Sequence, residues 1–272
     1  MQTHSSSVVA VKAARALEEL LEREFATVEE FERALERNSS ALRRANASHA
    51  SLQTTQREIL DRVAESEWTS VEAAKAATRE VVDEVVETVE TAKHEAARKA
   101  RELIEDGTTL MTHDFSTTVL EAIEQAANEG DYVTVYVKES RPRYFGRKTA
   151  RTLAAIDRVD VHLIVDAACG HYLPECDRVM FGMDCVVGDV LYNRVGTFPL
   201  AATANELDVP VTAVGSSAKL VGESFRFEND MRSGTEVLLE PADGFAVENP
   251  AYDATPTRLL DSVVTDKGIR QY

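Results

Sequence analysis

Residues 1–106 contain no glycine and no proline, the two residue types that most readily interrupt a helix. Apolar residues recur in this region every three or four positions, as in the valine-rich run 81–89. That spacing gives a helix one apolar face to bury. We therefore expect residues 1–106 to form a helical N-terminal domain, in which the polar segment 43–55 either bends the chain or lines a site.

The pattern changes at Gly107, where short apolar runs begin to alternate with segments of helical periodicity. These runs predict strands at 108–112, 132–137, 161–165, 178–181 and 211–214, and the periodic segments predict helices at 116–128, 147–156 and 197–207. Strands and helices that alternate in this way form a mostly parallel sheet with helices on both faces. Residues 107–272 are therefore expected to form an α/β domain, loop-rich after Phe225 and with a last short helix over 255–260.

Acidic residues outnumber basic ones by 47 to 30, which gives a formal net charge of −17 and an isoelectric point near 4.8. Bulk charge of this sign repels nucleic acids and anionic lipids, so we expect no nucleic-acid or membrane partner. Because high ionic strength screens the self-repulsion of such a charge, the composition favours a salt-rich cytoplasm. No apolar stretch reaches the length of a transmembrane helix.

Three cysteines, Cys169, Cys176 and Cys185, lie within seventeen residues of one another. They lack the C-x-x-C spacing of common zinc sites, so neither a metal site nor a disulfide framework is predicted, and a reducing compartment fits. The chain also lacks a G-x-G-x-x-G sequence and a P-loop. We therefore expect no dinucleotide or other cofactor.

The most informative segment begins at Gly182-Met183-Asp184 and continues nine residues later with Asn193, Arg194 and the pair Gly196-Thr197. Asp184 would follow a buried strand, where open α/β sheets bind their ligands. Gly196-Thr197 would open a helix whose N-terminal N–H groups can bind phosphate. The alternative is a strand, a turn and a capped helix with no ligand.

Four further polar residues follow predicted strands. Asp114 and Ser116 come after the first strand, so Ser116 either caps the next helix or faces a ligand together with Asp114. Arg141 follows the second strand and Lys219 follows the strand 211–214. Each cation is either a solvated surface residue or a phosphate ligand at the same edge of the sheet.

Taken in order, these motifs resemble the family that joins the alpha, beta and delta subunits of eukaryotic translation initiation factor 2B, their archaeal relatives, ribose-1,5-bisphosphate isomerase and methylthioribose-1-phosphate isomerase. The similarity covers residues 108–269 and rests on Met111-Thr112-His113 with Ser116, Glu139-Ser140-Arg141-Pro142, Val165-Asp166-Ala167-Ala168, Gly182-Met183-Asp184, Asn193-Arg194-Val195-Gly196-Thr197, Lys219, and the tail Asn249-Pro250-Ala251-Tyr252-Asp253-Ala254-Thr255-Pro256. The resemblance implies a Rossmann-like C-terminal domain, a phosphorylated ligand in the cleft between the two domains, and dimerisation through the C-terminal half.

In the isomerases of this family, a cysteine and an aspartate are the proposed acid–base pair that moves a proton between sugar carbons. The aspartate matches Asp184 and the family asparagine matches Asn193, but the position of the cysteine holds Asp114, and Arg194 stands where the family usually has lysine. The N-terminal arginine-glycine-alanine motif that binds phosphate in the isomerases is missing. A carboxylate at position 114 would also repel a phosphorylated substrate.

These departures lead us to expect a non-catalytic, regulatory homologue of the initiation factor 2B subunits. It would be a cytoplasmic homodimer of a salt-loving archaeon that binds a nucleotide or sugar phosphate, with initiation factor 2 or another translation factor as candidate partner, and it would not isomerise ribose 1,5-bisphosphate or methylthioribose 1-phosphate. The alternative is an aldose–ketose isomerase acting on a phosphorylated pentose, with Asp184 as the proton-transfer residue and Asp114 replacing the cysteine. A scaffold for metabolic enzymes with an empty cleft is a third interpretation.

Overall fold

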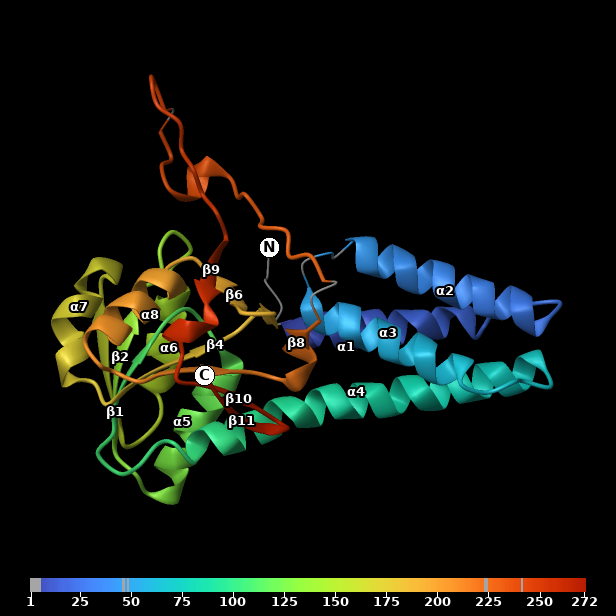
Figure 1. Cartoon of the computed structure of the whole chain (residues 1–272), viewed down its shortest axis with the longest axis horizontal. Coiled ribbons are helices and arrows are strands. Elements are labelled where there is room, and N and C mark those ends of the chain that lie inside the picture. The colour runs from blue at the N-terminus through green and yellow to red at the C-terminus, as the bar shows by residue number, and fades with distance from the viewer. Residues whose placement is uncertain (1–5, 46, 48, 223–224, 241) are drawn as a thin grey trace.

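The computed structural model describes residues 6–45, 47, 49–222, 225–240 and 242–272. It begins with a group of helices: α1 (Ser6–Ala16), the 3-10 turn η1 (Leu17–Leu20), α2 (Val28–Ala45), α3 (Ala50–Ala64) and α4 (Val71–Arg101). These helices lie side by side in an elongated bundle that projects from the rest of the molecule (Figure 1). Their apolar stripes meet in a common core that includes Leu17, Phe31 and Ile59. The helical first region predicted from the sequence is confirmed.

Helix α4 is 31 residues long and belongs to two cores. Its first turn is capped by Ser70, whose hydroxyl accepts a hydrogen bond from the main-chain N–H of Ala73 at 3.1 Å. Val82 and Val85 pack in the helical bundle, whereas Ala97 and Ala100 pack against the sheet. Because one helix packs in both cores, the two cores do not separate at residue 106. The domain boundary predicted there stays a prediction.

The main sheet has seven strands in the order β11-β10-β7-β4-β1-β2-β3. They are β1 (Thr109–Thr112), β2 (Val133–Lys138), β3 (Val159–Ile164), β4 (Arg178–Gly182), β7 (Val211–Val214), β10 (Ser262–Thr265) and β11 (Gly268–Gln271). Every neighbouring pair is parallel except β10 and β11 at one edge. The mostly parallel α/β sheet is therefore confirmed, and its first five strands in chain order lie where the apolar runs predicted them.

Helices cover both faces of this sheet, as predicted. One face packs against α5 (Thr117–Glu129), α6 (Phe145–Leu153) and the end of α4. The other packs against α8 (Thr197–Glu206) and a short segment made of η2 (Asp166–Ala168), α7 (Cys169–Tyr172) and η3 (Leu173–Glu175). Together the helices bury the apolar side chains of the sheet and leave its carboxyl edge as the place for a ligand.

A second, smaller sheet extends this carboxyl edge. It has the order β8-β5-β6-β9 and consists of β8 (Leu220–Val221), β5 (Cys185–Val187), β6 (Val190–Arg194) and β9 (Tyr252–Pro256). The last helix predicted over 255–260 is wrong in its first half, because Tyr252–Pro256 pairs with β6 as a strand and only η6 (Thr257–Leu259) is helical. This sheet carries Asp184 before β5, Arg194 at the end of β6, and Lys219 in η4 (Ser217–Lys219) before β8.

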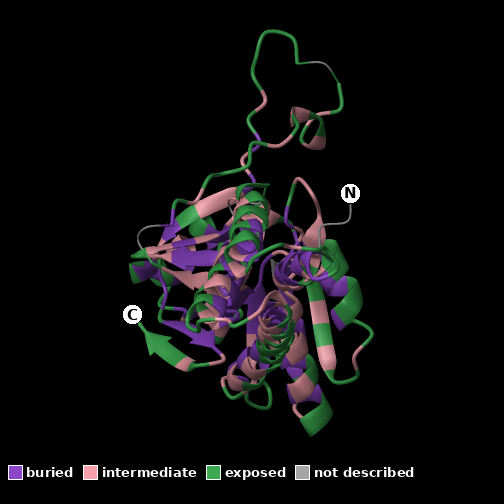
Figure 2. Cartoon of the chain, turned by 90° about the vertical axis from the view of Figure 1, so that its right-hand side faces the viewer, coloured by how far each residue is buried: buried purple, intermediate pink, exposed green. Residues whose placement is uncertain are grey.

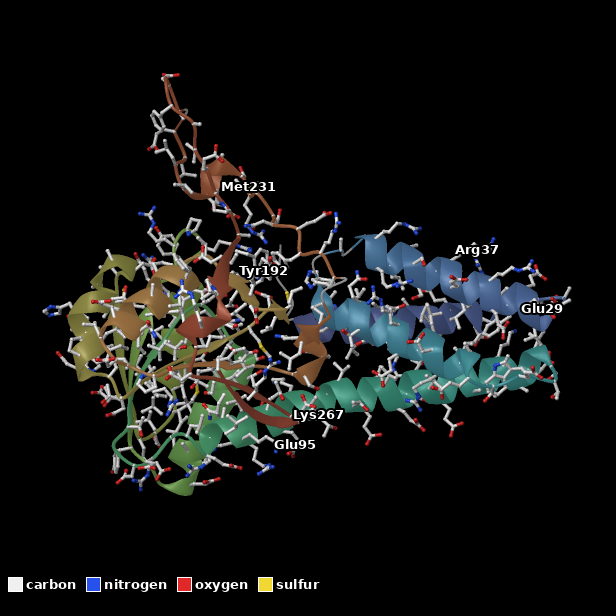
Figure 3. The ribbon with its side chains drawn as sticks, viewed as in Figure 1. Glu29, Arg37, Glu95, Tyr192, Met231 and Lys267 are labelled. Carbon is white, nitrogen blue, oxygen red and sulfur yellow. The ribbon has the colours of Figure 1, made fainter. Side chains whose placement is uncertain are left out.

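The described residues 225–240 and 242–249, together called the arm, leave the body of the molecule beside β9 (Figure 1). Met231 lies on the arm and Tyr192 on the small sheet near its base (Figure 3). Most of the arm is exposed or half-buried (Figure 2), and its regular structure within the described residues is limited to η5 (Gly234–Glu236) and a bridge between Met231 and Pro250. The loop-rich character predicted after Phe225 is confirmed. No described helix combines the length and the apolar character needed to cross a bilayer.

Candidate active site

A cavity of about 660 Å³ lies where the carboxyl ends of β1 and β4 meet the helical bundle. Its walls include most of the site residues predicted from the sequence, namely Asp114, Ser116, Asp184, Asn193, Arg194 and Lys219. His49, which directly precedes α3, lines the same cavity, so one residue of the polar segment 43–55 lines a site. The parallel sheet thus brings together side chains that are far apart in the sequence.

Arg194 forms the centre of this site. Its Nε atom lies 3.5 Å from Oδ2 of Asp114 and 3.7 Å from Oδ2 of Asp184, and its guanidinium lies 4.6 Å from the ring centroid of Tyr252. Burial raises the pKa of Asp114 to about 6, and the nearby Arg194 opposes part of that rise. Asp114 therefore exchanges its proton close to neutral pH, as a general acid or base must.

The turn between β1 and α5 fixes the position of Asp114. Its φ of 62° is a left-handed conformation that aspartate tolerates better than most residues. Its N–H donates to Oγ of Ser140 at 2.8 Å, and its carbonyl accepts from Oγ1 of Thr149 at 2.6 Å. These two bonds tie both main-chain groups of Asp114 to neighbouring segments.

Two buried side chains, those of His113 and Lys138, hold the turn that follows Arg194. Nε2 of His113 donates to the carbonyl of Val195 at 2.9 Å, and Nζ of Lys138 donates to the carbonyl of Gly196 at 3.1 Å. Burial lowers the pKa of both side chains, that of His113 to about 3, so His113 is neutral at physiological pH. Gly196 has a φ of 101°, and a Cβ there would lie 2.9 Å from the ring of His113. His113 is thus a positioning residue for the main chain beside Arg194.

At the far side of Arg194, Asp184 and Lys219 are held by main-chain contacts. The N–H of Asp184 donates to the carbonyl of Tyr192 at 3.1 Å, and Nζ of Lys219 donates to the carbonyl of Met183 at 2.6 Å. Burial lowers the pKa of Lys219, while the charge of Asp184 acts to raise it. Asn193 is buried, and its amide donates to Oγ1 of Thr197 at 3.0 Å.

Ser116 takes the capping role that its sequence context allowed. Its Oγ accepts a hydrogen bond from the N–H of Val119 at 3.3 Å at the start of α5. The same hydroxyl packs on Gly182, where a Cβ would lie only 2.6 Å from it. Ser116 also lines the cavity, so its role toward a ligand stays a prediction.

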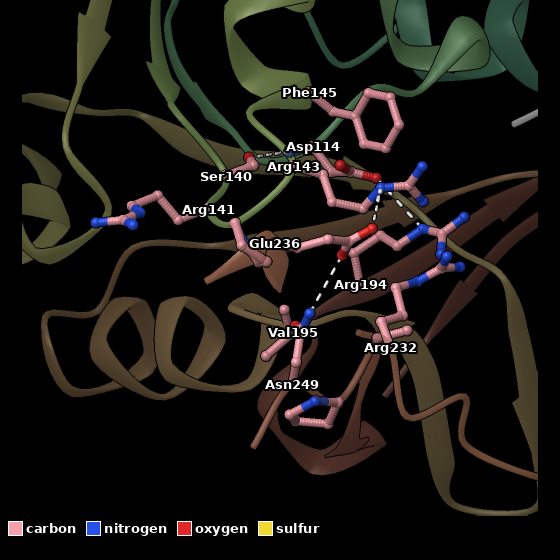
Figure 4. A pocket seen from close by; sticks show the side chains of 13 residues that line it. Asp114, Ser140, Arg141, Arg143, Phe145, Arg194, Val195, Arg232, Glu236 and Asn249 are labelled. Carbon is pink, nitrogen blue, oxygen red and sulfur yellow. Dashed lines mark hydrogen bonds and ion pairs between the residues drawn. The ribbon is translucent and has the colours of Figure 1, made fainter. Parts of the chain in front are cut away.

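Arg141 lines an adjoining smaller pocket together with Asp114 and Arg194, and not the large cavity, where the prediction placed it with Asp184. Its N–H donates to Oδ2 of Asp166 at 2.8 Å, and its side chain points away from Asp114 (Figure 4). Arg143, two residues later, lines the cavity instead. The reason is local: Ser140 and Tyr144 both have left-handed backbone angles, which redirect the side chains between them. The sequence shows both arginines but not these angles.

The three cysteines are free thiols, and all three are buried. Burial raises the pKa values of Cys176 and Cys185 to about 12, so both remain protonated thiols near neutral pH. Within the part of the chain that the structure describes, no group of three or more His, Cys, Asp or Glu side chains could hold a metal ion.

A family model described as the initiation factor 2 subunit family matches residues 2–271. The chain belongs to this family. It is 33% identical to the ribose 1,5-bisphosphate isomerase of Haloterrigena turkmenica, in a match that covers 98% of this chain and 86% of the relative.

Two solved structures share the fold over almost the whole chain. The crystal structure of the Pyrococcus horikoshii translation initiation factor eIF-2B superposes with a TM-score of 0.82 at 26% identity, covering 99% of this chain and 92% of the other. The tetrameric eIF2B-beta2-delta2 complex of C. thermophilum superposes with a TM-score of 0.79 at 20% identity, covering 99% and 86%. The fold of this chain therefore also occurs in a tetrameric complex.

The expectation of a non-catalytic, regulatory protein is wrong, and so is the expectation that the chain is not an enzyme. The full-length relative with 33% identity is an isomerase, whereas the initiation factor structure is only 26% identical. The expectation gave too much weight to charge repulsion by Asp114, because Arg194 lies 3.5 Å from that carboxylate. The candidate translation-factor partner loses its main support with this correction.

Proposed function

We propose that the protein is an aldose–ketose isomerase that acts on a phosphorylated pentose, with ribose 1,5-bisphosphate as the first candidate substrate. The observation that carries this proposal is the pair of carboxylates, Asp114 and Asp184, on one guanidinium at the carboxyl edge of the sheet. Basic side chains in the same cavity, Arg143 and Lys219, suit a phosphorylated ligand. The similarity to a ribose 1,5-bisphosphate isomerase supports the same substrate class.

The chemistry needs one base and one acid, because a 1-phosphorylated aldose has no free carbonyl group. Asp184 takes the proton from C2; the C1–C2 double bond forms as the bond between C1 and the ring oxygen breaks. Asp114, with its raised pKa, gives its proton to the ring oxygen. The enol hydroxyl at C2 then returns a proton to Asp114, and Asp184 delivers its proton to C1, which yields the ketose. Arg194 lies beside both carboxylates. It would stabilise the negative charge that develops on the C2 oxygen as the enol hydroxyl loses its proton.

The test is incubation of the purified protein with ribose 1,5-bisphosphate in molar potassium chloride, with the ketose followed by ¹³C nuclear magnetic resonance. We expect turnover, and we expect kcat/KM to fall as the pH rises through about 6, because Asp114 must be protonated to act as the acid. Methylthioribose 1-phosphate serves as the comparison substrate. Absence of turnover with both sugars would overturn the proposal.

We also propose that the protein works as a cytoplasmic homodimer in a salt-rich cell, with the C-terminal half at the two-fold interface. A tetrameric complex of the same fold and the net charge of −17 support this proposal. Light scattering in molar salt should give twice the chain mass of 30.0 kDa. A single species with the mass of one chain at micromolar concentration would contradict it.

A further inference from the structure

A second, smaller pocket of about 30 Å³ shares a wall with the large cavity. The shared wall is made of Asp114, Pro142, Arg143, Phe145, Arg194 and Glu236. The small pocket adds residues from the arm, among them Arg232 and Asn249. The two spaces therefore form one region, with the carboxylates and Arg194 on one side and the base of the arm on the other.

Three arginines from three separate segments meet in this region. Arg143 comes from the loop after β2, Arg194 from β6 and Arg232 from the arm, and their guanidinium groups gather on one side of the pocket (Figure 4). The side chains of Arg143 and Arg232 are each 21% exposed. Burial lowers the pKa of Arg143, and the nearby charge of Arg232 lowers it further. Such a gathering of like charges is costly unless an anion offsets it.

Two nitrogen atoms in this cluster lack partners. Nη1 of Arg143 and Nε of Arg232 are buried, and neither makes a hydrogen bond within the described part of the chain. A buried N–H group without an acceptor costs about 1–3 kcal/mol, and more when it is charged. Two such groups in one pocket indicate a missing acceptor.

Two anions of the arm only partly meet this need. Oδ2 of Asp230 pairs with Nη2 of Arg232 at 3.1 Å and leaves Nε of that arginine without an acceptor. Oε1 of Glu236 lies 3.7 Å from Nε of Arg143, whereas a charge-assisted hydrogen bond between such groups is about 2.7–2.9 Å long. Oε2 of Glu236 accepts a hydrogen bond from the amide of Asn249 at 3.2 Å. The carboxylate therefore stands beside Arg143 without occupying its free N–H groups.

We propose that Arg143 and Arg232 bind one phosphate of a bisphosphorylated sugar, and that the carboxylate of Glu236 moves aside to admit it. This inference rests on the proposed isomerase function, because it places one phosphate of the substrate in the small pocket at the base of the arm. The three oxygens of a phosphate satisfy the free donors of both guanidinium groups, which bind phosphate through paired N–H groups. The site therefore supplies a phosphate contact on the arm side of the cavity.

The test uses inorganic phosphate, which binds without turnover, titrated by calorimetry at constant ionic strength. We expect Arg143→Gln and Arg232→Gln each to weaken binding about tenfold or more, because each removes a charge-assisted contact. Arg147→Gln is the matched control: Arg147 lies in the same part of the chain, is 44% exposed, pairs with Glu139 at 2.8 Å and lines neither pocket. Its phosphate affinity should equal that of the wild type.

Glu236→Gln changes the same pocket in the opposite direction. This variant should bind phosphate several-fold more tightly than the wild type, and misfolding could not produce such a gain. Wild-type protein that binds no phosphate, or arginine variants that bind it as well as the wild type does, would overturn the inference. A Glu236→Gln variant with weaker binding would contradict the displacement of that carboxylate. Loss of phosphate binding in the arginine variants, together with no turnover by the wild type, would keep this site and reject the isomerase.

Discussion

The candidate site joins two regions that are built in different ways. At the edge of the sheet, Asp114 and Asp184 follow strands and Arg194 ends one, and main-chain bonds fix their direction. Arg232 and Glu236 come from the arm, where short turns replace strands. In the proposed function, the groups that transfer protons lie on the rigid edge, and groups that would recognise the substrate lie on the arm.

The two regions also differ in what holds them in place. Phe181 in β4 is fully buried, whereas Leu239 and Phe245 in the arm are 84% and 60% exposed. The arm is tied to the body at its base, where the N–H of Ala251 donates to the carbonyl of Asp230 at 2.9 Å and the amide of Asn229 donates to the carbonyl of Tyr252 at 2.8 Å. Stability therefore comes from the sheet and its helices.

The largest expected effect is on catalysis at the sheet edge. Asp184→Asn removes the proposed base while keeping the size of the side chain, so kcat should fall roughly 10²–10⁴-fold. The measurement is the rate of ketose formation from ribose 1,5-bisphosphate, with phosphate binding at the arm side as the control for folding. A variant that keeps wild-type kcat would remove Asp184 from the mechanism.

A pair of phenylalanines compares the stability of the two regions directly. Phe181→Ala should lower the free energy of unfolding by about 3–5 kcal/mol, because it opens a cavity in the core of the sheet. Phe245→Ala, at an exposed position, should change it by no more than about 0.5 kcal/mol. Chemical denaturation in the same salt measures both. Equal losses would mean that the arm packs against something in solution.

Asp114→Asn should stabilise the protein at high pH. Burial raises the pKa of Asp114 in the folded protein to about 6 from a usual value of 3.8, so its ionisation costs folding energy above pH 6. Asparagine carries no such cost, and the variant should be more stable at pH 8 by about 1–3 kcal/mol. The advantage should shrink as the pH falls from 6 to below 4. Melting curves across this range test the sign, and a variant less stable at pH 8 than at pH 4, relative to wild type, would refute it.

Limited proteolysis compares how readily each region is cleaved, and it has the smallest expected effect. Chymotrypsin should cut after Leu239 or Phe245 in the arm before it cuts any site in the sheet, because both side chains are exposed. Mass spectrometry of the first fragments identifies the cut. Cleavage that begins within β1 to β4 would contradict the proposed difference in stability.

The sequence predicted the edge of the sheet because parallel strands bring their carboxyl ends together whatever the length of chain between them. It therefore placed Asp184, Arg194 and Lys219 in one cavity. It missed most of the small sheet, since a strand as short as Cys185–Val187 is too short to show a period.

The contributions of Arg143, Arg232 and Glu236 could not be predicted either. The direction of Arg143 depends on the backbone angles of Ser140 and Tyr144, which no residue pattern specifies. Arg232 and Glu236 approach it from about ninety residues away, across an arm without periodicity. The effect of Asp114 was misjudged because the sequence shows its charge without showing the cation beside it.

Helix α4 runs through both the bundle and the body of the molecule, because Val82 and Val85 lie in one core and Ala97 and Ala100 lie in the other. One continuous helix acts as a stiff rod between the two halves, so neither half can melt without loosening the other. Heat or denaturant should unfold them in a single cooperative step.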